Sequence, residues 1–166
     1  MANMFVKNII DVNTGKVNGC NDGSILRSVA IGSCIAVVAC GCRHRAGCIA
    51  HVMLPGRSRN NDKNTKYAAD AIDELVTILA GFGVEQANIE VCLIGAGNVL
   101  EKPDDTICQA NIVSVEGILK ENNIPVRASV LGGYQRKSVM IDVACGKVSY
   151  TEGNGGETFL WQAGSK

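Results

Sequence analysis

The chain has 166 residues, with 16 basic and 16 acidic side chains and an isoelectric point near 6.7. This length fits one domain that folds around its own core. The balanced charge excludes the basic surface that nucleic-acid phosphates select, so we expect no nucleic-acid partner. No stretch reaches the length of a membrane span, and the start, "MANMFVKNIIDV", lacks a long apolar segment after a charged one. We therefore expect a cytoplasmic protein without membrane insertion.

The first half of the chain predicts mainly strands. Residues 4–12 and 25–32 are rich in β-branched side chains and flank a loop of turn-forming residues, "NTGKVNGCNDG". Residues 34–40 are continuously apolar, and 48–54 read as the returning strand of a hairpin with its turn at "GCRHRAG". Eight cysteines are present, but a reducing compartment and a core of this size make disulfides the least favoured use for them.

The second half predicts two helices and further strands. Apolar residues recur at three- and four-residue spacing over 66–82 and again over about 104–121, which is typical of amphipathic helices. Strands are expected at 88–95, 124–131, 137–144 and 147–151. We predict an α+β layered domain over residues 1–151, with mostly antiparallel, packed sheets and two helices on the outside, each burying its apolar stripe against a sheet face. Residues 152–166 are glycine-rich and are expected to be a flexible C-terminal extension.

Cys34 stands in a context that suits a nucleophile. In "AIGSC", Gly32 permits a close backbone approach, and the N–H groups of Ser33 and Cys34 can point to a bound oxygen. This is the layout of a nucleophile beside an oxyanion hole. The alternative is a buried small side chain, which the local pattern taken alone favours because free cysteine is among the most buried residue types.

His51 is the first candidate for the base that would activate this thiol. A hairpin centred on His44 brings residue 34 near residue 54, with His51 diagonally across from Cys34. A shift of one residue in the register would move His51 to the other face of the sheet. His44 is the second candidate, although a solvated turn residue is the simpler interpretation of it.

A zinc site is a further alternative. Its ligands would come from a set of cysteines and histidines in one short span: Cys40, Cys42, His44, Cys48 and His51. Zinc ligands usually occur in pairs with two to four residues between them, so the C-x-C spacing fits poorly. We therefore expect no metal and no cofactor, and we expect Cys92 and Cys108 to lie in the core.

Several motifs together resemble the chemoreceptor glutamine deamidases called CheD, over residues 4–151. The most specific is "GSC" followed by "AHVMLP", with sixteen residues between Cys34 and His51; "KYA" and "GGYQRKSV" are weaker matches. The resemblance implies an α/β/β cysteine-hydrolase fold, similar to that of certain glutamine-deamidating bacterial toxins. It also implies that Cys34 is the nucleophile and His51 the base. Ser28 stands where the family usually has a threonine, and it keeps the hydroxyl group.

The chain departs from the family pattern at several positions. Ala30 replaces a glycine, Ala69 stands at the position of an aspartate and is followed by Asp70, and a "GGA" stretch reads "GAG" at 95–97. The segment "IGxRN" reads "ICQAN" at 107–111 and keeps only its first and last residues, the last being Asn111. These changes bear on the recognition of substrate and partner.

The resemblance implies hydrolysis of glutamine to glutamate, through a cysteine thioester, on the cytoplasmic region of a methyl-accepting chemoreceptor. An alternative function is a binding module with weak or no turnover, which docks onto a chemotaxis phosphatase of the CheC type or onto the receptor. A third is a structural domain stabilised by zinc.

Overall fold

The centre of the fold is a five-stranded sheet in which β4 (Ile35–Gly41) is buried along its whole length. The computed structural model describes residues 6–41, 43–60 and 62–164. In the central sheet β4 lies between β5 and β6, and the strand order is β2-β5-β4-β6-β7. The remaining strands of this sheet are β2 (Val17–Cys20), β5 (Ala46–Val52), β6 (Ile89–Gly95) and β7 (Val126–Leu131).

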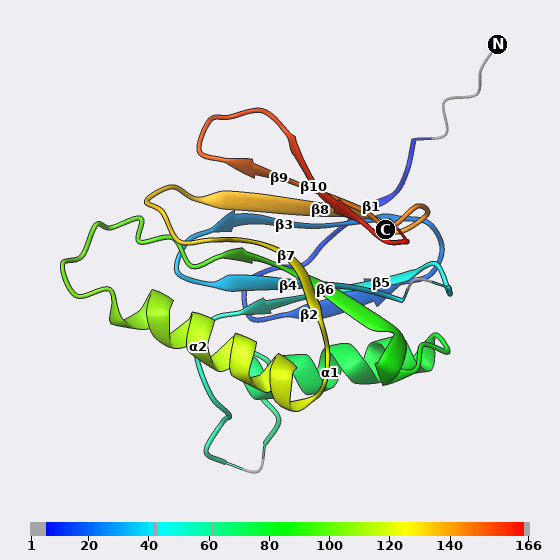
Figure 1. The fold of residues 1–166 in the computed structure, drawn as a ribbon, viewed down its shortest axis with the longest axis horizontal. Helices are drawn as coiled ribbons and strands as arrows, with labels where there is room; N and C mark the ends of the chain where they lie inside the picture. The colour runs from blue at the N-terminus through cyan, green and yellow to red at the C-terminus, as the bar shows by residue number, and fades with distance from the viewer. Residues whose placement is uncertain (1–5, 42, 61, 165–166) are drawn as a thin grey trace.

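A second five-stranded sheet packs against one face of the central sheet (Figure 1). Its order is β1-β3-β8-β9-β10, which are Ile9–Asp11, Ile25–Ile31, Lys137–Asp142, Lys147–Glu152 and Thr158–Gln162. The core between the sheets joins Leu26 and Ile141 from the second sheet to Val38 and Ile49 from the central one. Burial of such side chains stabilises the fold by roughly 1.5–3 kcal/mol each.

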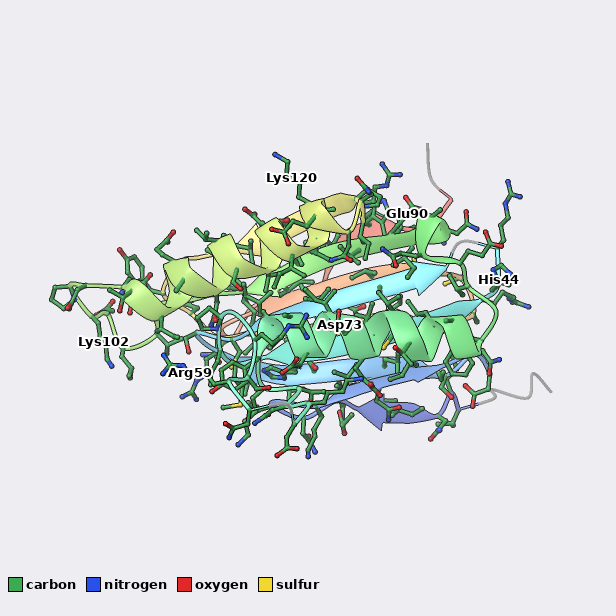
Figure 2. The ribbon with its side chains drawn as sticks, turned by 90° about the horizontal axis from the view of Figure 1, so that it is seen from below. His44, Arg59, Asp73, Glu90, Lys102 and Lys120 are labelled. Atoms are coloured by element: carbon green, nitrogen blue, oxygen red, sulfur yellow. The ribbon has the colours of Figure 1, made fainter. Side chains whose placement is uncertain are left out.

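Two helices, α1 (Ala68–Gly81) and α2 (Thr106–Glu121), lie side by side across the other face of the central sheet (Figures 1 and 2). A short 3-10 turn, η1 (Gln86–Asn88), precedes β6. Because successive side chains of a strand point to opposite faces, the odd-numbered residues of β4 pack under the helices and the even-numbered ones pack between the sheets. The α/β/β layering predicted from the sequence is therefore confirmed. In the part of the chain that is described, no helix is long and apolar enough to cross a membrane.

The structure differs from the sequence prediction in four places. Strand β2 lies in the expected loop, because it pairs with the edge of β5. Both sheets are mostly antiparallel, as expected, but each also contains one parallel pair: β1 with β3, and β6 with β7 through the α2 crossover. Residues 158–162, expected in a flexible extension, form β10 and pair with β9. The strand expected from residue 4 begins at Ile9, and residues 4 and 5 lie outside the described part.

Ala30 offers a test of the bulge that interrupts β3 between Ser28 and Ile31. Its φ is 55°, in the left-handed region that disfavours residues with a Cβ atom. We expect Ala30→Gly to stabilise the protein by about 0.5–1 kcal/mol, measured by urea unfolding. Ala80→Gly is the matched control: in the last turn of α1 it should destabilise by up to about 1 kcal/mol. Equal destabilisation by both changes would contradict the expectation.

Candidate active site

The loop formed by residues 32–34 connects β3 to β4, and each of its three carbonyl groups accepts a hydrogen bond. In chain order the donors are the backbone N–H of Gly97 (2.9 Å), the side-chain amide of Asn111 (3.0 Å) and the backbone N–H of Ala96 (2.7 Å). The donors come from the segment after β6 and from α2. The loop is therefore held from its inner side by two separate elements.

The backbone N–H groups of Ser33 and Cys34 have no acceptor among the described residues. In a trans peptide the N–H and C=O groups point in opposite directions. The N–H groups of Ser33 and Cys34 therefore point away from the donors that bind the carbonyls of Gly32 and Ser33. Burial raises the pKa of the Cys34 thiol, and the N–H group of Cys34 acts in the opposite direction because it favours the thiolate.

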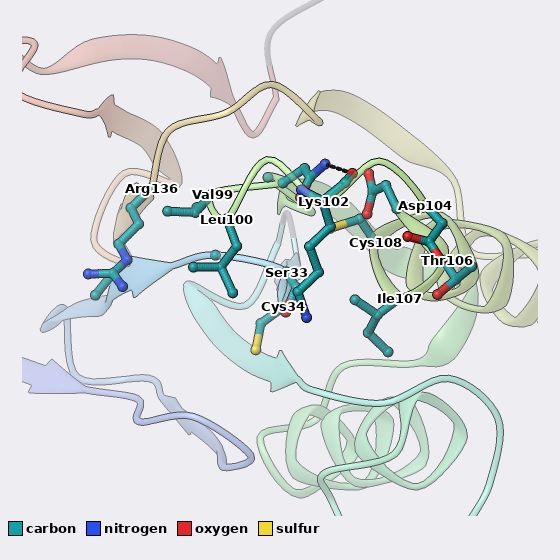
Figure 3. A pocket seen from close by; sticks show the side chains of 15 residues that line it. Ser33, Cys34, Val99, Leu100, Lys102, Asp104, Thr106, Ile107, Cys108 and Arg136 are labelled. Carbon is teal, nitrogen blue, oxygen red and sulfur yellow. Dashed lines mark hydrogen bonds between the residues drawn. The ribbon is translucent and has the colours of Figure 1, made fainter.

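Half-buried Cys34 lies at a pocket of about 650 Å³. Figure 3 shows Arg136 on one side of the pocket, Thr106 and Ile107 on the opposite side, and the cysteine between them. Leu100, 74% exposed, lines the pocket too. The pocket therefore combines a nucleophilic atom, free backbone donors and an apolar rim.

Gly95 allows the loop to approach β6. Its φ is 132°, and a Cβ atom there would lie 2.2 Å from the carbonyl oxygen of Cys34. That oxygen is the acceptor for Ala96 N–H, so the clash would fall directly on the hydrogen bond that holds the cysteine. This position of the chain therefore requires glycine.

His51 lies on the same face of the central sheet as Cys34. The ladder pairs Ile35 with Val52 and Ala36 with His51, so its continuation sets Cys34 opposite residue 53. The sequence prediction, with the turn centred on His44, placed residue 54 opposite Cys34 and is wrong by one residue. In the observed register His51 and Cys34 face the second sheet as diagonal neighbours.

The ring of His51 is buried, with 2% of the residue exposed. Burial lowers the pKa of His51, while the carbonyl of Val12 acts in the opposite direction. Its Nδ1 atom is buried and has no hydrogen-bond partner. The backbone of His51 is fixed by hydrogen bonds with Gly15 and Lys16, both 2.9 Å, which precede β2. The histidine is thus rigidly held and carries one unused nitrogen.

Ser28 lies in β3 of the second sheet and is 1% exposed. Its hydroxyl group donates to the main-chain carbonyl of Val12, at 2.7 Å. This is the carbonyl that acts on His51. Ser28 and His51 are therefore connected through one backbone oxygen rather than by a direct hydrogen bond.

The other candidate residues lie away from this arrangement. His44 is exposed in the turn between β4 and β5. Of the zinc alternative, Cys40 faces the second sheet and Cys48 faces the helices, because they lie on opposite sides of the central sheet. Cys42 is outside the described residues, and within the described part no group of three or more His, Cys, Asp or Glu could hold a metal. The seven described cysteines are free thiols, with Cys92 and Cys108 in the core as expected.

The family model of CheD, described as CheD chemotactic sensory transduction, matches residues 53–152. The chain belongs to the CheD family. A probable chemoreceptor glutamine deamidase CheD of Chlorobium luteolum is 35% identical over 150 residues, covering 89% of this chain and 75% of the relative. The chemoreceptor glutamine deamidase CheD of Thermotoga maritima is 32% identical over 137 residues, covering 82% of this chain and 87% of the relative.

No structural role could be predicted from the sequence for three residues around the loop of residues 32–34 in this CheD-family member: Gly95, Asn111 and Lys137. The motifs "GAG", "ICQAN" and "GGYQRKSV" contain them, but their contacts depend on the fold. Lys137 is 2% exposed, and its Nζ donates to the carbonyl of Gly132 at 2.5 Å. Gly132 in turn donates its N–H to the carbonyl of Gly95 at 2.9 Å, so Lys137 is connected to the loop only through Gly132 and Gly95.

Acid should destabilise this protein partly through His51. Its pKa is lowered in the folded state, so as the pH falls below about 6.5 the unfolded chain gains a proton that the folded chain resists. We expect the free energy of unfolding to decrease from pH 6.5 to pH 5, and to decrease less in His51→Leu. Urea unfolding at several pH values measures this, with His44→Gln as the control that removes the exposed histidine. The same slope in His51→Leu and the unaltered protein would contradict the expectation.

Gly95→Ala should displace the loop formed by residues 32–34, because the added carbon atom overlaps the Cys34 carbonyl. We expect a loss of at least about 2 kcal/mol of stability in urea unfolding. Gly117→Ala is a matched control in α2, where a Cβ atom meets nothing within 4 Å, and it should stabilise by about 0.5–1 kcal/mol. Unchanged stability in Gly95→Ala would show that the loop approaches β6 less closely than described.

Proposed function

We propose that this CheD-family protein hydrolyses glutamine side chains of a chemoreceptor's cytoplasmic region to glutamate, with Cys34 as nucleophile. The names of the relatives, chemoreceptor glutamine deamidases, support the substrate class. The observation that carries the proposal is the half-buried thiol at an open pocket beside two unpaired backbone N–H groups. Such donors stabilise the oxyanion that forms when a carboxamide is attacked.

In the proposed reaction Cys34 Sγ forms a bond to the carboxamide carbon, and His51 accepts the thiol proton. The N–H groups of Ser33 and Cys34 bind the oxyanion. The loop does not require glycine at position 32, where a Cβ atom would meet only Val99, at 3.7 Å. The C–N bond then breaks, and ammonia leaves with the proton from His51. Water that His51 deprotonates hydrolyses the thioester, which releases the glutamate side chain and restores the thiol.

Burial favours a neutral pair before substrate binds, since it raises the pKa of Cys34 and lowers that of His51. A neutral imidazole carries one proton. We assign it to Nε2, toward the carbonyl of Val12, which leaves the unpaired Nδ1 as the base. Ser28 then serves as a positioning residue, because its hydroxyl group fixes that carbonyl at 2.7 Å.

The pocket walls suit a protein surface better than free glutamine. Leu100 is 74% exposed and Ile107 is 37% exposed, and both line the pocket. An exposed apolar rim favours burial against a macromolecular partner. The charged side chains of the lining are of both signs, with Lys102 and Arg136 opposed by Asp104 and Asp105, so the apolar rim carries this preference. A receptor in the cytoplasm would place this protein there too.

The test is peptide mass spectrometry of a chemoreceptor cytoplasmic fragment incubated with the unaltered protein or with Cys34→Ala. We expect conversion of glutamine to glutamate only with the unaltered protein. Cys92→Ala is the matched control: Cys92 is fully buried between the sheets, so its loss should leave turnover intact and lower stability by roughly 1 kcal/mol through a small cavity. Equal turnover by both variants would defeat the assignment of Cys34.

The binding-module function gives a different result in the same experiment. It predicts a stoichiometric complex, with the receptor fragment or with a CheC-type phosphatase, that survives Cys34→Ala while no ammonia is released. The CheC-type partner stays a prediction. Ammonia release by the unaltered protein would exclude a module without turnover.

A further inference from the structure

Asn111 joins the nucleophile loop to the strand that carries His51. It is fully buried in α2, and its Nδ2 atom donates to the carbonyls of Ser33 (3.0 Å) and Met53 (3.1 Å). Both partners are acceptors, so the amide nitrogen, not its oxygen, must face them. One side chain thus uses both of its N–H bonds to hold two backbone segments together.

The other half of the same amide is unused. Asn111 Oδ1 is buried with no hydrogen-bond partner, a status shared among the described side chains only with His51 Nδ1. A buried acceptor without a donor disfavours folding, so packing alone would be served better by an apolar side chain of similar size. The two donated bonds are what an asparagine supplies at this position.

We propose that Asn111 is a positioning residue for the oxyanion hole, which fixes the peptide between Ser33 and Cys34 with its N–H toward the pocket. This inference rests on the proposed deamidation. Because the peptide is planar and trans, holding the Ser33 carbonyl inward also directs the Cys34 N–H outward. Without the Asn111 amide, the Ser33 carbonyl loses its hydrogen-bond donor. The peptide could then rotate, and its carbonyl oxygen would take the place of the N–H group at the position where the oxyanion forms.

The hydrogen bond from Asn111 to the carbonyl of Met53 also restrains the strand that carries His51, the proposed base. Met53 lies two residues after His51, just beyond the end of β5, and its carbonyl is bound by the same nitrogen as the Ser33 carbonyl. Asn111 therefore limits the separation of the loop that carries the nucleophile from the strand that carries the base. Small displacements of such groups reduce rates strongly.

The test compares Asn111→Ala and Asn111→Asp with Asn122→Ala. Asn122 lies at the end of the same helix and donates to the carbonyl of Ile118 at 2.8 Å, so its variant removes a similar bond away from the pocket. Asn111→Asp keeps the size of the side chain but loses its donors. Three readouts are needed: thermal unfolding, kcat and KM on the receptor fragment, and the rate of Cys34 alkylation by iodoacetamide, resolved by peptide mass spectrometry.

We expect kcat of Asn111→Ala to fall by about 100-fold, with KM little changed and the protein folded at the assay temperature. Alkylation of Cys34 should also slow at neutral pH, because the Cys34 N–H that favours the thiolate turns away. Asn122→Ala should keep both rates. Asn111→Asp should follow Asn111→Ala, and if Asn111→Asp fails to fold, Asn111→Ala decides.

Wild-type kcat and alkylation rate in a folded Asn111→Ala would overturn the inference. So would losses no larger than those in Asn122→Ala, because they would reflect helix packing alone. If the unaltered protein converts no glutamine, the proposed function fails, and the alkylation rates alone then decide whether Asn111 orients the peptide.

Discussion

The arrangement around Cys34 depends on the direction of a few peptide groups. Three consecutive carbonyls accept hydrogen bonds from donors of two different elements, and the N–H groups of Ser33 and Cys34 have no acceptor among the described residues. Backbone donors cost little reorganisation when charge develops on a substrate oxygen, because they are already oriented. The sheets and helices of this protein serve to hold those peptides in place.

The complete burial of β4 explains how this is achieved. Its odd-numbered side chains pack under α1 and α2, and its even-numbered side chains pack against the second sheet. A shift by one residue would exchange the two sets, so both layers oppose it. Packing of the whole core therefore determines the register of β4 against β5, and this register sets the relative positions of the 32–34 loop and His51.

The layered fold, both helices and most strands could be predicted from apolar periodicity. Strand β2 could not, because Val17–Cys20 contain turn-forming residues and become a strand only by pairing with β5. Cys34 and His51 were identified from their motifs, but their shared face was not, since a hairpin register depends on the turn. The contacts of Asn111 could not be predicted, because its hydrogen-bond partners are 78 and 58 residues away in the chain.

The connection of Ser28 and His51 through the carbonyl of Val12 spans the two sheets. Ser28 belongs to β3 of the second sheet, and His51 and the loop of Cys34 belong to the central sheet. The boundary between the layers therefore passes between Ser28 and His51, and sliding of one sheet over the other would separate them. Any ligand that touches both layers would oppose that sliding and stabilise the folded chain in proportion to its occupancy. A ligand in the pocket would therefore also increase the free energy needed to separate the two sheets.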